Sequence, residues 1–182
     1  AIQHRVSVTV RKKRRPGRVK SPYISECLGT MGVRATVYVR SQLPSSSGLG
    51  SSAAVTVATL CAINDEFGKG LTREEIAQRA FEIERKVQRG RASATDTFVS
   101  SFGGDVLIHG SEKRILPPAN LPIVVGNSRV SHNTSLMVEK VGREREQHPA
   151  IVDPIRDAIG ALTQEALLRL HDPRGLGTLM NT

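Results

Sequence analysis

The sequence predicts a mixed α+β fold, with strands in the first part of the chain and helices alone at its end. Apolar and polar residues alternate over residues 2–10 and again over 33–40, which is the period of a half-buried strand. A largely apolar run over 51–67, ended by Gly68, is typical of a buried helix. Three helical segments fill residues 134–181, so we expect a helical part after the mixed part.

The composition favours a globular protein without membrane spans. The 182 residues are 38% hydrophobic and 24% charged, which is enough for one or two domains with a sizeable core. No run approaches the ~20 apolar residues of a membrane helix, and residues 1–15 lack the apolar segment of a signal peptide. Cys27 and Cys61 have neither CxxC nor zinc spacing, so we expect reduced thiols in the cytoplasm.

The net charge of +9 is concentrated near the start of the chain. Eight basic residues lie within the first twenty positions: Arg5, Arg11, Lys12, Lys13, Arg14, Arg15, Arg18 and Lys20. Such a run can bind nucleic acid, but Pro16-Gly17 within it favours a solvated turn between two strands. Aromatic residues make up only 3%, fewer than stacking on single-stranded RNA requires. Nucleic-acid binding is therefore the less favoured interpretation.

The middle of the chain contains two clear local signals. Residues 21–31 predict a short helix between the two strands. Thr72 and Glu75 form a capping box, so a helix should begin there and continue to about Gln88. Residues 89–104 form a loop of small residues around one acid, Asp96.

The second half of the chain should begin with strands. We expect a hairpin over 105–110 and 114–118, and a buried strand over 121–127, LPIVVGN. Helices are expected over 134–147 and 151–171, with a last one from about Pro173.

The segment PSSSGLGSS, residues 44–52, connects a strand to a buried helix. Glycines let backbone N–H groups approach an anion, and the helix N-terminus adds its own N–H groups and dipole. Neither GxxxxGK[ST] nor GxGxxG matches. The charge of a triphosphate would therefore be met by Mg²⁺, the helix dipole and cations from elsewhere. The alternative is a flexible Ser-rich turn.

Two segments resemble one family of kinases. PSSSGLGSSAA, residues 44–54, resembles the second signature motif of the kinases named for galactokinase, homoserine kinase, mevalonate kinase and phosphomevalonate kinase. ASATDTFVSSFGG, residues 92–104, is most similar to the archaeal mevalonate kinases within it. The segments YISECL, EIERKVQ and GLGTLMNT also fit, so the resemblance covers essentially the whole chain.

The resemblance implies a two-layer fold, with an N-terminal part like the second domain of ribosomal protein S5 and a helical C-terminal part. An ATP-binding domain would span residues 1–120, and 121–182 would begin the C-terminal domain. The implied reaction is phosphorylation of (R)-mevalonate by Mg·ATP to 5-phosphomevalonate, in the isoprenoid biosynthesis of the cytoplasm. The family's Lys-bearing first motif and its third, Gly-rich motif have no match, so we expect a piece of a longer protein. A homodimer is compatible with the resemblance, and no membrane partner is expected.

The resemblance also assigns the site residues. ATP binding falls to one continuous segment: Pro44, Ser45, Ser46, Ser47, Gly48, Leu49, Gly50, Ser51, Ser52, Ala53 and Ala54. Asp96 would be the catalytic base, and Ser52 and Glu84 would bind Mg²⁺. Substrate contacts would come from the loop of small residues and from the start of the helix at 134: Thr97, Ser100, Gly103, Gly104 and Thr134.

Each assignment has an alternative. Asp96 could be the N-cap of a short helix, and Thr134 could equally be a cap. Glu84 could be a surface residue paired with Gln88, and Glu82 would replace it if the helix phase were shifted. For the whole protein, the alternatives are another small-alcohol or sugar kinase of the family, or an S5-like module that binds RNA through its basic segment.

Overall fold

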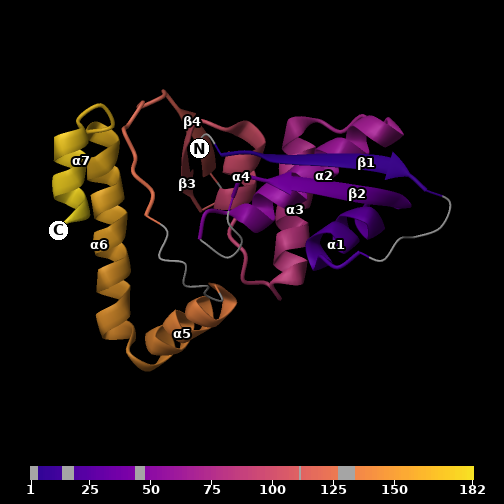
Figure 1. The fold of residues 1–182 in the computed structure, drawn as a ribbon. Helices are drawn as coiled ribbons and strands as arrows, with labels where there is room; N and C mark the ends of the chain where they lie inside the picture. Colours follow the sequence, from indigo (N-terminus) through magenta and orange to yellow (C-terminus); the bar gives the residue numbers. More distant parts are fainter. Residues whose placement is uncertain (1–3, 14–18, 44–47, 111, 127–133) are drawn as a thin grey trace. The chain divides into compact units, whose positions relative to one another are not determined.

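The computed structural model describes residues 4–13, 19–43, 48–110, 112–126 and 134–182 (Figure 1). The chain divides into two compact units. Unit 1 comprises Ala1–Leu116 with Arg129–His132, and unit 2 comprises Pro117–Ser128 with Asn133–Thr182. The domain boundary expected at residue 120 stays a prediction, because compact units within one chain are not yet shown to fold independently.

The first sheet of unit 1 pairs two strands that a helix separates in sequence. Strand β1 (Val6–Lys12) is antiparallel to β2 (Ala35–Ser41), with Val6 opposite Ser41. Helix α1 (Pro22–Thr30) lies between them in sequence, and the side chain of Ser21 caps its N-terminus. We expected Pro16-Gly17 to turn between two strands. These residues lie outside the described part. The next described element is α1, so a helix lies in the connection between β1 and β2.

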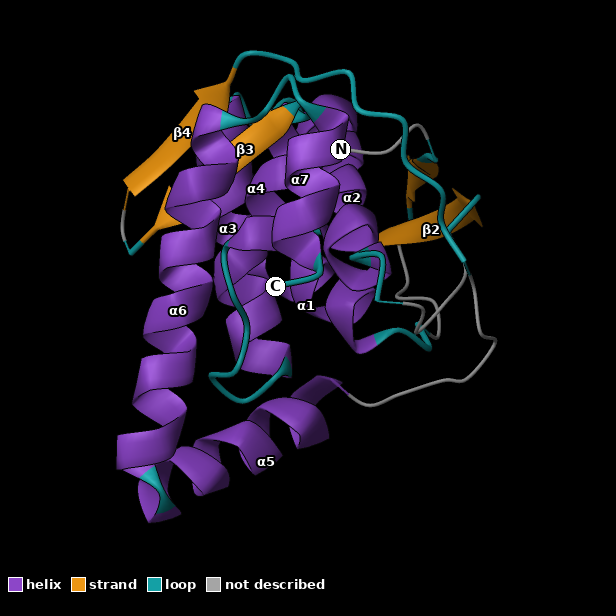
Figure 2. Ribbon diagram, turned by 90° about the vertical axis from the view of Figure 1, so that its left-hand side faces the viewer, coloured by secondary structure: helices purple, strands orange, loops and turns teal. Residues whose placement is uncertain are grey.

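Helix α2 (Ser51–Phe67) is the centre of unit 1. It contacts β1 and the helices α1, α3 (Arg73–Val87) and α4 (Thr95–Phe102) (Figures 1 and 2). The buried core joins apolar side chains from these elements: Val10, Cys27, Met31, Ala35, Val57, Leu60, Ile63, Ile76, Ala80 and Ile83. The predicted bounds of α2 are confirmed, and α3 begins at the predicted capping box, in which both hydrogen bonds are present.

A separate antiparallel hairpin completes unit 1. Strands β3 (Asp105–His109) and β4 (Glu112–Leu116) pair with Asp105 opposite Leu116, as the sequence predicted to within two residues. Strand β3 contacts α4. The hairpin lies apart from β2 in both views (Figures 1 and 2).

The described part of unit 2 contains three helices, and prolines mark the starts of two of them. They are α5 (Thr134–Gln147), α6 (Pro149–Leu168) and α7 (Pro173–Met180). Pro149 and Pro173 occupy first-turn positions, where a missing N–H costs nothing. Helix α6 begins two residues before the predicted start and ends three before the predicted end. None of the described residues of this unit is buried.

The buried strand predicted for residues 121–127 is wrong for the part that the structure describes. Residues 121–126 form neither strand nor helix, and the side chain of Val124 is 97% exposed. A strand requires a partner for its N–H and C=O groups, and the described residues provide none here. An apolar run by itself does not distinguish a strand from other structures.

Within the described residues, every helix is too short or too polar to cross a lipid bilayer.

Candidate active site

The Gly/Ser loop meets the N-terminus of α2 through a left-handed backbone. Gly48 and Gly50 adopt φ angles of +77° and +65°, which favour glycine. Gly50 is the N-cap of α2 and supplies no side-chain hydrogen bond. Among the described residues, no side chain caps the first N–H groups of α2, and such groups at a helix start can bind an anion. Four residues assigned to ATP binding, Pro44, Ser45, Ser46 and Ser47, lie outside the described residues.

The other residues assigned to ATP binding surround this helix start. Leu49, Ser51, Ser52 and Ala54 are half-buried, and Ala53 is buried against the core. The half-buried hydroxyls of Ser51 and Ser52 lie in the first turn of α2, on the side of the loop. ATP binding by these residues stays a prediction at this point.

Glu84 places a buried carboxylate against the same helix start. Its side chain comes from α3 and the residue is 4% exposed. Ser52 Oγ donates to Oε2 at 3.2 Å, and Thr56 Oγ1 donates to Oε1 at 3.1 Å. Gln88 Nε2 also donates to Oε2. The alternative in which Glu84 is a surface residue is therefore wrong, although Gln88 does contact it.

The pKa of the Glu84 carboxyl is raised, and burial is the largest cause. Hydrogen bonds from Thr56 and Ser52 oppose the shift, and the negative charge of Asp96 adds to it. The nearby Tyr23 hydroxyl, 3.5 Å from Gln88 Nε2, also has a raised pKa, because of burial and then the charge of Glu84. The donors to Glu84 in the described part of the chain are Ser52, Thr56 and Gln88, and all three are uncharged.

Glu82 does not occupy this position. It is exposed on α3, and its Oε1 accepts a hydrogen bond from Gln78 Nε2 at 2.9 Å. Because 3.6 residues make one helical turn, a shift of two residues moves a side chain to the opposite face. The structure therefore supports Glu84, not Glu82, as the acid that faces the loop.

Asp96 lies in the first turn of α4 and is exposed. The N-cap of this helix is Ala94, so the alternative role of Asp96 as N-cap is wrong. Ser93 Oγ accepts the N–H of Thr95 in its place, at 3.1 Å. The expectation of a loop throughout residues 89–104 is corrected in the same way, because α4 occupies 95–102.

Asp96 also approaches the Gly/Ser loop. A Cβ added to Gly50 would lie 3.2 Å from Cγ and 3.4 Å from Oδ2 of Asp96. Together with its electrostatic effect on Glu84, this contact brings the loop, the buried acid and the exposed acid to one end of α2.

The residues assigned to substrate binding are dispersed. Thr97 is 1% exposed and its hydroxyl donates to the carbonyl of Ala94, whereas Ser100 is exposed on the same helix. Gly103 and Gly104 follow α4 with positive φ angles of 71° and 69°. Thr134 begins α5 in unit 2, and its side chain lies outside the described part. Their contacts with a substrate stay predictions.

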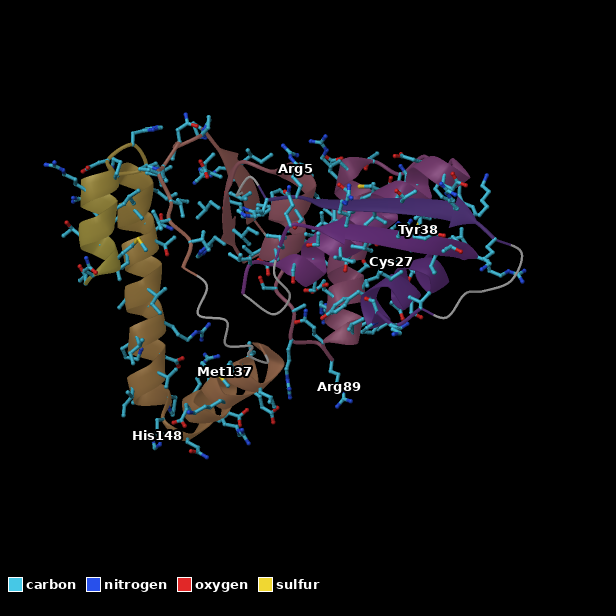
Figure 3. The ribbon with its side chains drawn as sticks, viewed as in Figure 1. Arg5, Cys27, Tyr38, Arg89, Met137 and His148 are labelled. Carbon is cyan, nitrogen blue, oxygen red and sulfur yellow. The ribbon has the colours of Figure 1, made fainter. Side chains whose placement is uncertain are left out.

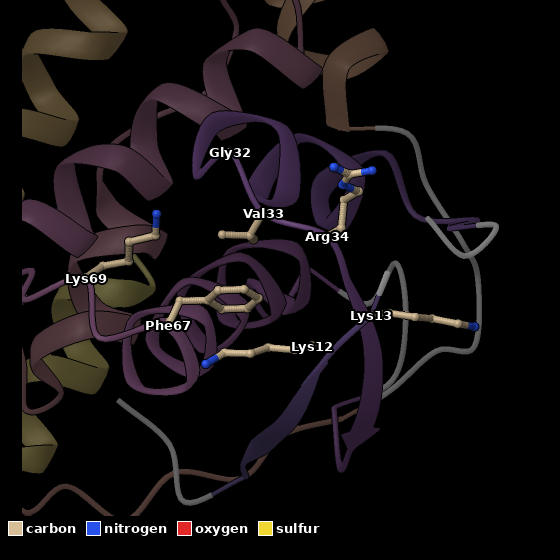
Figure 4. A pocket seen from close by; sticks show the side chains of 7 residues that line it. All are labelled: Lys12, Lys13, Gly32, Val33, Arg34, Phe67 and Lys69. Carbon is tan, nitrogen blue, oxygen red and sulfur yellow. The ribbon is translucent and has the colours of Figure 1, made fainter. Parts of the chain in front are cut away.

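Two residues of the basic segment, Lys12 and Lys13, lie at the other end of α2. Lys12 and Lys13 line a pocket of about 410 Å³ with Arg34, Phe67 and Lys69 (Figure 4). Lys12 Nζ lies 5.2 Å from the centroid of the Phe67 ring. Helix α2 has 17 residues, so about 25 Å separates this pocket from the Gly/Ser loop.

Sequence reasoning missed one member of the buried cluster, Thr56. It follows Ser52 by four residues on α2, a spacing that places both on one helix face. That spacing was the available signal, but a Thr in an apolar helix is also typical of a core position.

Cys27 lies inside unit 1, where its thiol donates to the carbonyl of Thr56 at 3.8 Å (Figure 3).

Comparison with known proteins identifies the class of protein that this fold and site define. Residues 18–104 match the model of the GHMP kinases N terminal domain. Over these residues the chain is a GHMP kinase N-terminal domain.

Within that family, the similar curated proteins are mevalonate kinases of archaea. The mevalonate kinase of Thermococcus sibiricus is 42% identical over 153 residues, which cover 80% of this chain and 46% of that protein. The mevalonate kinase of Archaeoglobus fulgidus is 41% identical over 152 residues, covering 81% and 52%. The chain thus spans about half the length of these two relatives.

Solved structures confirm the predicted fold class. The crystal structure of L. major mevalonate kinase in complex with R-mevalonate matches with a TM-score of 0.71 and 21% identity, covering 98% of this chain and 63% of that one. Methanococcus jannaschii mevalonate kinase matches with a TM-score of 0.60 and 23% identity, covering 87% and 51%. The predicted α+β fold, with its S5-like N-terminal part, is therefore confirmed.

Proposed function

We propose that the protein carrying this chain transfers the γ-phosphoryl group of ATP to (R)-mevalonate, giving 5-phosphomevalonate and ADP. The observation that carries the proposal is the meeting of three features at the N-terminus of α2. These are the left-handed Gly50, the buried carboxylate of Glu84 and the exposed carboxylate of Asp96. The relatives at about 40% identity, all named mevalonate kinase, support the choice of substrate.

The phosphates of ATP would be held by the Gly/Ser loop and the first turn of α2. Because Gly50 has no side chain, backbone N–H groups of this turn can approach phosphate oxygens directly. The helix dipole adds partial positive charge at the same place. This accounts for phosphate binding without the lysine of a GxxxxGK[ST] loop.

The residues around Glu84 fit a hard divalent cation. Among the described residues, the Glu84 carboxylate has only neutral donors, and Asp96 adds a second negative charge nearby. The 3.2 Å between Ser52 Oγ and Glu84 Oε2 is close to the ~3 Å that separates adjacent ligand oxygens around octahedral Mg²⁺. No group of three or more His, Cys, Asp or Glu residues gathers in the described ranges. Mg²⁺ bound here would need phosphate oxygens and water as well, and it would neutralise the phosphates.

Asp96 would act on the substrate alcohol. A carboxylate that accepts or orients the hydroxyl proton is what phosphoryl transfer requires of the protein. Its exposure leaves it accessible to a substrate, and its approach to Gly50 places it beside the expected phosphates. Thr97, Ser100, Gly103, Gly104 and Thr134 remain the proposed substrate contacts.

The proposal includes a cellular setting. Cys27 and Cys61 are both free, which supports a reducing compartment such as the cytoplasm. A homodimer stays a prediction.

One observation supports each of two other functions, phosphorylation of a different alcohol and binding of a polyanion. The crystal structure of a homoserine kinase from Cytophaga hutchinsonii shares the fold with a TM-score of 0.50, so the fold alone does not choose the alcohol. The cations around the pocket at Phe67 favour polyanion binding as a second candidate. A salt titration of RNA binding tests the latter, because released counterions give a steep dependence of affinity on salt.

ADP release by the purified full-length gene product tests the proposal. The rate is measured with ATP and Mg²⁺ on mevalonate, homoserine and galactose in parallel. We expect mevalonate to be preferred by kcat/KM, and a higher kcat/KM on either other alcohol would overturn the choice of substrate.

A further inference from the structure

The hydroxyl of Thr56 is wholly enclosed at the candidate metal site. Thr56 is 0% exposed, and its Oγ1 lies 3.1 Å from Glu84 Oε1 and 2.9 Å from the carbonyl oxygen of Ser52. Within this enclosed space, a hydrogen bond to a carboxylate is stronger than at the surface, because one partner is charged and little water competes. The bond therefore constrains the carboxylate.

The two oxygens of Glu84 have different partners. The single hydroxyl proton of Thr56 is shared between Oε1 and the carbonyl oxygen of Ser52, while Ser52 Oγ and Gln88 Nε2 donate to Oε2. The terminal torsion of a glutamate is broad and has no sharp preference of its own. A donor fixed to Oε1 therefore decides which oxygen is directed toward Ser52, the other expected metal ligand.

We propose that Thr56 is a positioning residue that holds the Glu84 carboxylate in the orientation required for a divalent cation. The inference rests on the proposed function, because it assumes that Glu84 and Ser52 bind the metal of Mg·ATP. Thr56 itself contacts neither metal nor substrate in this account. It acts through Oε1 of Glu84.

Thr59 provides a matched comparison within the same helix. It is also 0% exposed, and its hydroxyl donates to the carbonyl four residues earlier, Val55, at 2.7 Å. The described residues include no carboxylate bonded to Thr59. A change of Thr to Val at either position removes a buried back-bonded hydroxyl at nearly constant shape. Only the change at Thr56 also removes a hydrogen-bond donor to Glu84.

Direct metal binding is the readout. Mn²⁺ replaces Mg²⁺ and is titrated by electron paramagnetic resonance into the full-length gene product with a non-hydrolysable ATP analogue. Removing a hydrogen-bond partner of a metal ligand typically weakens metal affinity by 10–100-fold. We expect Thr56→Val to weaken Mn²⁺ binding by roughly tenfold or more, and Thr56→Ser and Thr59→Val to stay near wild type. The Mg²⁺ concentration for half-maximal rate should shift in parallel.

The outcomes separate this inference from the function on which it rests. If wild type binds Mn²⁺ and Glu84→Gln does not, but Thr56→Val matches Thr59→Val, the positioning role is overturned while the metal site stands. If wild type binds no Mn²⁺ with the nucleotide, the metal site itself fails and takes the inference with it. Should Thr56→Val not fold, Thr56→Ala must lose Mn²⁺ affinity and Thr56→Ser must retain it. Equal affinities for those two overturn the role.

Discussion

Asp96 lies beside Gly50 at the start of α2, so close that a Cβ added to Gly50 would lie 3.2 Å from Cγ of Asp96. Gly50 belongs to the loop expected to hold phosphate, and Asp96 is the expected base. The expected phosphate site and the expected base therefore meet at a residue that has no side chain. Two features therefore disfavour a side chain at position 50: the left-handed backbone of Gly50 and the nearby carboxyl group of Asp96.

Substitution of Gly50 should separate these two constraints. Gly50→Ala places a Cβ in a left-handed residue, at a cost of about 1–2 kcal/mol in stability, and it also displaces Asp96. Gly68→Ala is the matched control, because Gly68 has φ +58° and no described heavy atom within 4 Å of its Cβ position. We expect similar losses of stability by thermal melt, but loss of nucleotide affinity and kcat only for Gly50→Ala. Full activity of Gly50→Ala would contradict the role of the loop.

Glu84→Gln should stabilise the metal-free protein at neutral pH. Burial raises the pKa of Glu84 above 4.5, so the folded state binds the proton more tightly than the unfolded state. The contribution of the Glu84 proton to the free energy of unfolding is therefore fully present below pH 4.5. It is lost as the pH rises through the pKa that Glu84 has in the folded protein. In excess chelator, we expect Glu84→Gln to melt a few degrees above wild type near pH 7 and to lose this advantage below pH 4.5. A variant less stable than wild type at neutral pH would contradict a net cost of burying the charged Glu84 carboxylate.

Asp96→Asn should slow catalysis strongly with little effect on folding. Asp96 lies in the first turn of α4, where its charge contributes about 0.3–1 kcal/mol through the helix dipole. Loss of a general base lowers kcat by roughly 10²–10⁴. Glu82→Gln, at an exposed acid on α3, is the control and should keep its rate. Steady-state kinetics beside thermal melts check both, and a near-normal kcat for Asp96→Asn would remove Asp96 from the mechanism.

Cys27 should be unreactive in the folded protein. Burial raises the pKa of its thiol to about 12, so about one thiol in ten thousand is ionised at pH 8. Cys61 is only half-buried. Brief alkylation followed by mass spectrometry should label Cys61 well before Cys27, and both should react once the chain is unfolded in guanidinium. Rapid labelling of native Cys27 would indicate that the core around α1 opens readily.

Local signals predicted the elements whose ends are set by single residues. The bounds of α2 followed from an apolar run ended by Gly68, and α3 from the capping box of Thr72 and Glu75. The strand over 121–127 failed because pairing depends on a partner that the apolar run does not specify. Helix α4 was missed because small residues over 89–104 show no helical period.

The candidate site was predictable in type but not in geometry. Resemblance named Ser52 and Glu84, yet the choice between Glu84 and Glu82 depends on helix phase, which packing against α2 decides. Thr56 became visible only when α2 and α3 were in place, because a buried Thr in an apolar helix reads as core.

The most direct test of the account is to identify the phosphorylated product. The full-length gene product is incubated with Mg·ATP and (R)-mevalonate, and phosphorus NMR follows the γ-phosphate. We predict a new phosphomonoester signal from 5-phosphomevalonate in step with ADP, and its absence with Glu84→Gln and Asp96→Asn. ADP with inorganic phosphate alone, or the same product from both variants, would contradict the proposed transfer at this site.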